Sequence, residues 1–247
     1  MEKLRSAWDT ALGTSLSLKR IAGAALQWLW MLMMFYSIVP YGFSSDVRGS
    51  LYTSLLISLV AMVVTMLFVA VIVRRERVSA NRSIVLGSAI MMSVGSVLTP
   101  FSDPTTPAGM LVLGLSAVMT GTGSAVLFLC WIELESGLGG RLALVELAAS
   151  LCAAIAVGLV LIVGPAVPVI ALIVTMPVLS AVLLRRCSIT TPQLARGPEQ
   201  PLSRHTIALF AKALLGAMLI GMLMGFFDVV SGFKTYAVQD IFGAYLF

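Results

Sequence analysis

The chain has 247 residues, of which 59% are hydrophobic and only 11% are charged, and its mean hydropathy is +1.02. So few charges cannot form the water-facing surface of a soluble domain of this size. The apolar runs are continuous, not alternating, which excludes a transmembrane β-barrel. The net charge of +5 comes from basic residues at the ends of these runs, so it does not indicate nucleic-acid binding. The composition predicts an all-α, polytopic membrane protein whose main partner is the lipid bilayer.

Six apolar spans are predicted after a polar lead-in at residues 1–20, which we expect to be cytoplasmic. Asp9 and the pair Lys19-Arg20 interrupt this lead-in, which argues against a cleavable signal peptide. The spans are expected at residues 21–42, 51–73, 84–101, 109–133, 142–163 and 166–184. At about 1.5 Å per residue the run 109–133 is long enough to cross a bilayer, and the span 84–101 is short. Residues 21–184 are therefore predicted to form a six-span bundle.

The remaining residues predict a linker and the start of a second helical half. Residues 185–206 are rich in proline and have no hydrophobic periodicity, which is typical of a linker. A seventh span is expected at 207–227, and residues 241–247 resemble the opening of an eighth. We expect residues 207–247 to be an incomplete second half. No internal repeat is visible in the sequence.

The distribution of basic residues predicts the orientation. If the N-terminus is inside, thirteen of the 16 Lys and Arg residues lie on the cytoplasmic side. The other side holds only Arg48 and Lys234, and Lys212 lies within the seventh span. The positive-inside rule therefore predicts a cytoplasmic N-terminus.

The fourth span, residues 109–133, keeps its small residues on one face. Gly114, Ala117, Gly121 and Ser124 are spaced i, i+3, i+7 and i+10, so they form one stripe on a helix. Small residues let neighbouring backbones approach closely in lipid, and we expect this span to be the central helix. In the seventh span, Gly221 and Gly225 form a Gly-x-x-x-Gly packing pattern.

Two ionisable residues within the spans, Glu146 and Lys212, are open to two interpretations. Each lies near the cytoplasmic end of its span, where a long side chain can reach the membrane interface. Because charges are costly in hydrocarbon and often functional, the alternative is a pair that forms the inner gate of a cavity.

Polar and aromatic residues on the first and fourth spans are candidate ligand contacts. They are expected near the midplane, between the first, fourth, fifth and seventh spans, and the set is Gln27, Trp30, Tyr36, Thr120 and Thr122. The alternative for the aromatic residues is packing between helices or placement at the interface. Trp131, two residues before Glu133, is typical of an interfacial anchor.

Catalytic chemistry is not predicted. Ser124 has no histidine base in the membrane, because the single histidine, His205, lies in the linker. Paired intramembrane aspartates, a phosphate-binding glycine loop and a metal-ligand cluster are absent from the sequence. We therefore expect no enzymatic activity, no metal and no cofactor.

The fourth span resembles a motif of the major facilitator superfamily. Residues 121–125, Gly-Thr-Gly-Ser-Ala, resemble the Gly-x-Gly-small-small end of the fourth-helix motif, and six spans before a basic linker resemble the family plan. The family motif has a proton-coupling arginine four residues before its first glycine, where this chain has Ala117. Residues 74–82 are basic but lack the glycine and aspartate of the family loop. The resemblance implies a scaffold without its coupling residues.

Residues 121–125 followed by Cys-Trp-Ile-Glu-Leu at 130–134 are similar to the membrane half of actinobacterial LuxR-type regulators. In these a facilitator-like bundle precedes a cytoplasmic helix-turn-helix domain, which implies a small-molecule sensor in the bacterial inner (plasma) membrane. This sequence has no helix-turn-helix segment, so we expect no direct contact with nucleic acid from it. Further helices or a second chain are expected to complete it. The alternatives are a secondary transporter of a small solute and a truncated fragment of either.

Overall fold

The computed structural model describes residues 16–72, 78–136, 138 and 140–190. The contacts divide the chain into two compact units, Met1–Gln193 and Leu194–Phe247, and the described residues lie in the first unit. The predicted seventh span at 207–227, the eighth-span start, and the residues Lys212, Gly221 and Gly225 lie outside the described residues.

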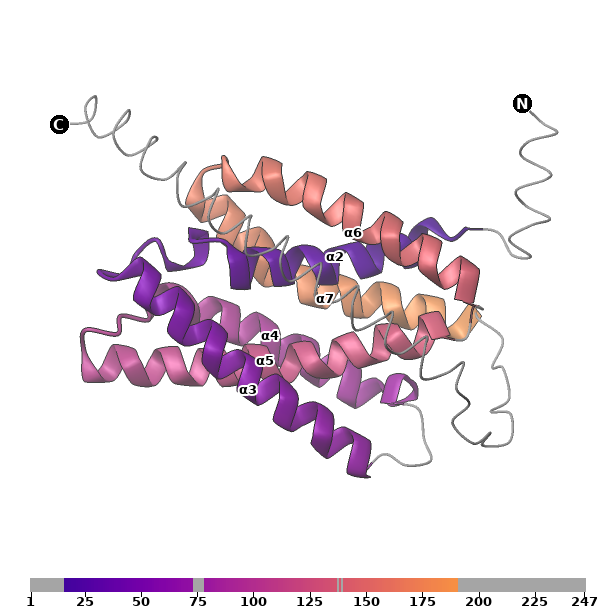
Figure 1. The fold of residues 1–247 in the computed structure, drawn as a ribbon, viewed down its shortest axis with the longest axis horizontal. Coiled ribbons are helices and arrows are strands. Elements are labelled where there is room, and N and C mark those ends of the chain that lie inside the picture. Colours follow the sequence, from indigo (N-terminus) through magenta and orange to yellow (C-terminus); the bar gives the residue numbers. More distant parts are fainter. Residues whose placement is uncertain (1–15, 73–77, 137, 139, 191–247) are drawn as a thin grey trace, which may run out of the picture. The chain divides into compact units, whose positions relative to one another are not determined.

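Within these ranges the chain folds into helices and connecting segments, without strands. The long helices are α2 Leu18–Tyr36, α3 Val47–Ile72, α4 Arg82–Leu98, α5 Pro107–Ser136, α6 Gly140–Ile162 and α7 Ala166–Thr190 (Figure 1). Short 3-10 helices are η1 Val39–Tyr41, η2 Val78–Ala80 and η3 Thr99–Phe101. The predicted all-α fold class is confirmed at this level.

Five of the described helices, α3 to α7, are long and apolar enough to cross a membrane, with mean hydropathies between 1.8 and 2.6. These helices give the chain the character of a multi-pass membrane protein. Helix α2, which corresponds to the predicted first span, is not among them. It begins at Leu18 and ends at Tyr36, so it carries Lys19, Arg20 and Gln27 within only 19 residues. These polar side chains lower its hydropathy.

Helix α3 presents an apolar surface to the outside. Leu56, Val63 and Phe68 are 66%, 55% and 64% exposed, respectively. A water-soluble protein rarely leaves a helix face of this kind uncovered. Exposed apolar side chains along a long helix are what contact with lipid requires.

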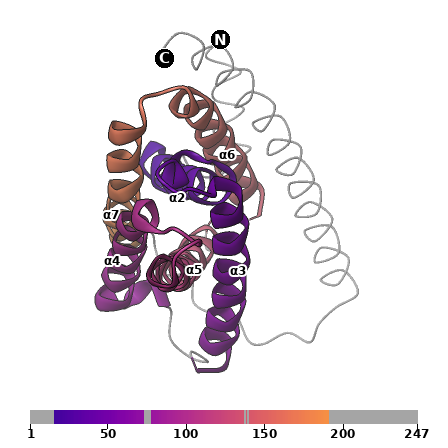
Figure 2. The same cartoon turned by 90° about the vertical axis from the view of Figure 1, so that its left-hand side faces the viewer.

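The six long helices pack as two groups of three (Figure 2). In the group that we call the α5 triad, α5 lies between α3 and α4; in the α2 triad, α2 lies between α6 and α7. Helices α4 and α7 join the two triads. The two halves of the chain thus make corresponding contacts: α2 corresponds to α5, α3 to α6 and α4 to α7. If corresponding helices are exchanged, the same main pairs of helices remain in contact. The bundle therefore has two central helices, where the sequence predicted only one.

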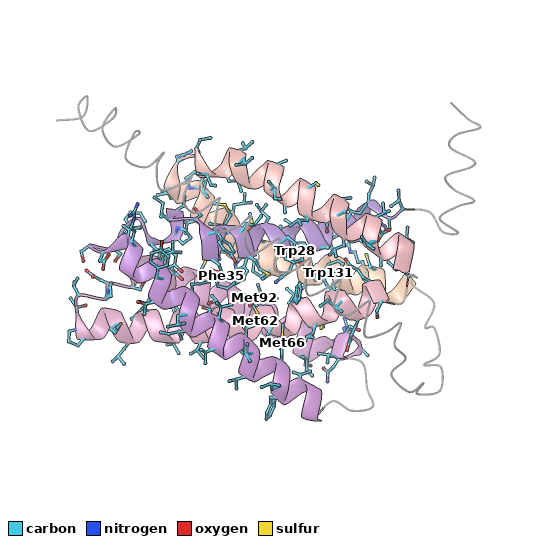
Figure 3. All side chains as sticks on the ribbon, viewed as in Figure 1. Trp28, Phe35, Met62, Met66, Met92 and Trp131 are labelled. Carbon is cyan, nitrogen blue, oxygen red and sulfur yellow. The ribbon has the colours of Figure 1, made fainter. Side chains whose placement is uncertain are left out.

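The equivalence extends to the residues that α4 and α7 bury. Among the side chains that each helix buries, four have the same spacing on both helices, and the fourth of each set is a serine. The sets are Val85, Ala89, Met92 and Ser96 on α4, and Val169, Ile173, Met176 and Ser180 on α7. Trp30, Phe35 and Trp131 share one core cluster with most of these residues, and Figure 3 labels Phe35, Met92 and Trp131 within the bundle.

Candidate functional site on one face of α2

One face of α2 carries the polar contacts that connect the helices of the bundle. Arg20, Gly23, Gln27 and Trp30 are spaced i, i+3, i+7 and i+10, so they follow one stripe of the helix. Arg20 contacts α6, Gly23 contacts α5 and α7, and Trp30 contacts α4. Gln27 lies between these contacts along the stripe.

At the first level of the stripe, Arg20 pairs with Glu146 of α6. Its Nε donates to Oε2 at 2.7 Å and its Nη2 donates to Oε1 at 2.7 Å. The backbone N–H of Ser17 also donates to Oε1, at 3.0 Å. The Glu146 side chain is 1% exposed, so it is buried against its neighbours. Its partner in the described part is Arg20; the predicted partner Lys212 lies outside the described residues.

At the second level, Trp131 of α5 reaches the backbone of α2. Its indole Nε1 donates to Ser180 Oγ at 3.0 Å, and the Ser180 hydroxyl donates to the Gly23 carbonyl at 2.8 Å. A Cβ on Gly23 would collide with the Trp131 ring, so the glycine is what lets the indole approach. Trp131 is 3% exposed, and the prediction of an interfacial anchor is therefore wrong.

Gln27 is the third level of the stripe and is described below. At the fourth level, the indole of Trp30 bonds a serine of α4, as the indole of Trp131 bonds a serine of α7. The Trp30 Nε1 donates to Ser96 Oγ at 3.0 Å, and the Ser96 hydroxyl donates to the Met92 carbonyl at 2.8 Å. Because α2 corresponds to α5 and α4 to α7, the pair Trp30–Ser96 corresponds to the pair Trp131–Ser180. The two tryptophan–serine pairs, which we call the indole clasps, thus lie on either side of Gln27 along the stripe.

Gln27 is the exception among the buried polar side chains of the described residues. It is 1% exposed, and neither its Nε2 nor its Oε1 has a hydrogen-bond partner within the described part of the chain. Leaving a buried polar group without a partner costs about 1–3 kcal/mol. An unsatisfied group of this kind in a native structure indicates a function or an additional molecule that satisfies it. The Gln27 amide is therefore the best candidate for a ligand contact.

The other predicted ligand residues do not all share this position. Thr120 is fully buried, but its hydroxyl lies 2.9 Å from the Ser116 carbonyl and 3.1 Å from the Ala117 carbonyl of its own helix. It also lies 3.4 Å from Ser58 Oγ, in the contact between α3 and α5. Thr122 and Tyr36 are half-buried. Gln27 and Trp30 share one face, whereas Thr120 belongs to the α5 triad.

The small-residue stripe of α5 lies against α3 over part of its length, and Gly123 beside the stripe lies against α4. A Cβ on Gly121 would collide with the backbone of Ser58 in α3, and one on Gly123 would lie 2.6 Å from the Ser88 carbonyl in α4. Ala117 and Ser124 are fully buried. A Cβ on Gly114 would meet no atom within 4 Å, so this residue is not needed for close packing.

Sequence reasoning missed the partners that hold α2 in place. Arg20 was placed in the polar lead-in, and Ser96 and Ser180 gave no signal because serine is common in apolar helices. Glu133 was also missed as a structural residue: its carboxylate accepts the backbone N–H groups of Val78 at 3.1 Å and Ser79 at 2.9 Å. The sequence did contain one signal for these contacts: Arg20, Gly23, Gln27 and Trp30 have the spacing of a single helix face.

Comparisons with protein-family models, with curated proteins and with solved structures give no match. Within the part of the chain that the structure describes, no group of three or more His, Cys, Asp or Glu residues could hold a metal ion. The polar group that distinguishes the candidate site among the described residues is the neutral amide of Gln27.

Proposed function

We propose that this bundle is the small-molecule-binding domain of a sensor in the bacterial plasma membrane, with a cytoplasmic N-terminus. The single observation that carries the proposal is the buried Gln27 amide, whose two polar atoms have no partner in the described chain. A sensor needs a site that is incomplete without its ligand. Gln27 lies on a helix that contacts α4, α5, α6 and α7, so occupation of this site can change how the helices pack.

The charges around the stripe favour an uncharged ligand. The guanidinium of Arg20 and the carboxylate of Glu146 satisfy each other through two short hydrogen bonds. This pairing also supports α2 as a sixth span, because a neutralised Arg20 is less costly near the membrane than an isolated charge.

Sensing is favoured over transport by residue 117. The related transporters place a proton-coupling arginine at this position of their fourth-helix motif. Here Ala117 is fully buried, and its carbonyl accepts the Ser58 hydroxyl at 2.9 Å. The resemblance to LuxR-type regulators would then provide the output, through a helix-turn-helix domain in the complete regulator.

A second candidate function, secondary transport of a small uncharged solute, is favoured by a different observation. The helix contacts are unchanged when α2, α3 and α4 are exchanged with α5, α6 and α7. Structural repeats of this kind are common in secondary transporters, which use them to alternate between two arrangements.

The full chain in proteoliposomes distinguishes the two functions. A panel of neutral solutes is tested for accumulation against a gradient and for an increase in the thermal unfolding midpoint. We expect stabilisation without accumulation, loss of stabilisation in Gln27→Met, and its retention in Thr175→Val. Thr175 is a suitable control because its exposed hydroxyl bonds only the Leu172 carbonyl of its own helix among the described hydrogen bonds. Accumulation would establish transport, and stabilisation that survives Gln27→Met would exclude the site.

A further inference from the structure

We infer that the Gln27 site takes ligands with a hydrogen-bond donor and an acceptor side by side, as in a cis-amide, a lactam or a cyclic urea. The inference rests on the proposed function and names the ligand class of the same site. It starts from the fact that both the Nε2 and the Oε1 of Gln27 are unpartnered.

The chain itself offers little to satisfy the Gln27 oxygen. The hydroxyl protons of Ser96 and Ser180 are committed to the carbonyls of Met92 and Gly23. A hydroxyl has one proton, so neither serine can donate to Gln27 Oε1 without losing its present bond. The hydroxyl protons of both indole clasps are therefore already used.

The carbonyl of the preceding turn is also occupied. Gly23 O accepts the Ser180 hydroxyl at 2.8 Å, and as a helix carbonyl it accepts the backbone N–H of Gln27 as well. A carbonyl has two lone pairs, so this acceptor is full. The Gln27 Nε2 cannot turn back to it, as serine and threonine hydroxyls elsewhere in the bundle turn back to their own helices.

A primary amide such as Gln27 presents its N–H and its C=O in one plane on the same side. The complementary group has an acceptor and a donor at the same spacing, and the cis-amide edge of a lactam provides both in one uncharged molecule. The indole clasps on either side of Gln27 along the stripe favour a compact apolar remainder.

The test uses 2-piperidone and N-methyl-2-piperidone with the full-length chain in nanodiscs. The two probes have the same ring and carbonyl, but methylation removes the N–H that would donate to Gln27 Oε1. Binding is measured from tryptophan fluorescence and from the unfolding midpoint. We expect saturable binding of 2-piperidone and at least about tenfold weaker binding of the N-methyl probe, because one hydrogen bond is lost and Oε1 stays unpaired.

Two variants complete the design. Gln27→Met should abolish the preference between the probes, whereas Thr175→Val should keep it. If both probes bind equally and both depend on Gln27, the ligand class is wrong but the proposed binding site stands. If neither probe shows a response that depends on Gln27, while another neutral solute does, the ligand class is again overturned. If no solute gives such a response, only water binds the Gln27 amide. This result would contradict both the ligand class and the proposed function.

Discussion

The two triads have the same contact pattern but are held together by different chemistry. In the α5 triad the backbones meet directly, because Gly121 lies against Ser58 and Gly95 lies against Ser116 and Thr120. In the α2 triad, the ion pair of Arg20 with Glu146 joins α2 to α6, and the hydrogen bond from the Ser180 hydroxyl to the Gly23 carbonyl joins α7 to α2. Close backbone contact leaves little room for rearrangement, whereas side-chain contacts can be exchanged. The comparison indicates that the α2 triad is the adaptable half, and it is also the half that contains Gln27.

The largest expected effect comes from breaking the ion pair of the α2 triad. Arg20→Met leaves the Glu146 carboxylate buried without a countercharge, and we expect a loss of about 3 kcal/mol in the free energy of unfolding. The double variant Arg20→Met/Glu146→Leu should recover most of this loss, because neither charge of the pair then remains buried without its partner. Denaturant titration of the full chain in detergent measures both. An unchanged stability of Arg20→Met would show that the pair does not hold the triad together.

A smaller effect is expected from widening the backbone contact of the α5 triad. Gly121→Leu would force α3 away from α5, and overpacking of this kind costs about 2 kcal/mol. Gly114→Leu is the matched control on the same helix, since a side chain there meets open space. The same denaturant titration compares the two variants. Equal stabilities for them would contradict the close contact between Gly121 and Ser58.

The indole clasps test whether the two triads are equivalent. Ser96→Ala and Ser180→Ala each leave one indole N–H without its acceptor. Each substitution should therefore lower the free energy of unfolding by about 1 kcal/mol, and the two losses should be similar. The two losses should add in the double variant if the clasps act independently. A loss confined to one serine would mean that the symmetry of the contacts has no energetic counterpart.

The smallest effect is expected outside both triads, at Asp103 in the connection between α4 and α5. Hydrogen bonds from the Thr105 backbone, the Thr105 hydroxyl and the Ser45 hydroxyl lower the pKa of Asp103 below its usual 3.8. A carboxylate with a lowered pKa in the folded state stabilises the fold above its usual pKa, and this contribution is lost as the pH falls below that value.

Asp103→Asn should therefore lower the unfolding midpoint slightly at pH 7 and by less near pH 3. Because Asp103 is fully exposed, solvent screens these bonds and the difference should be smaller than those above. Thermal unfolding of both proteins at the two pH values measures it. A deficit of the same size at both pH values would mean that the carboxylate charge is not responsible.

The apolar helices were predictable from the sequence, but their partners were not. Continuous apolar runs locate α3 to α7 within a few residues, since hydrophobic length is a local property of the chain. The first span was displaced: residues 21–42 were expected, and α2 covers 18–36 because Ser37 is extended before Pro40. Arg20 thus lies on the helix and reaches Glu146, a contact across the fold that no local pattern reveals.

For the candidate site, the sequence identified Gln27 and Trp30 because polar and aromatic residues are conspicuous in an apolar span. It could not separate them from Thr120, whose hydroxyl bonds its own helix in the α5 triad. That distinction depends on which neighbour each helix face meets. The equivalence of the triads was also hidden, because it lies in the helix contacts and in only a few matching residues, such as Ser96 and Ser180.

The central claim is that the Gln27 amide is kept for a ligand and does not stabilise the bundle. The stability of Gln27→Met without ligand tests this most directly, because methionine has a similar shape and no polar group that needs a partner. We predict that Gln27→Met unfolds at a higher denaturant concentration than the wild type, since a buried unsatisfied amide is removed. A loss of about 1 kcal/mol or more would show that the amide is already satisfied within the protein and would contradict the account.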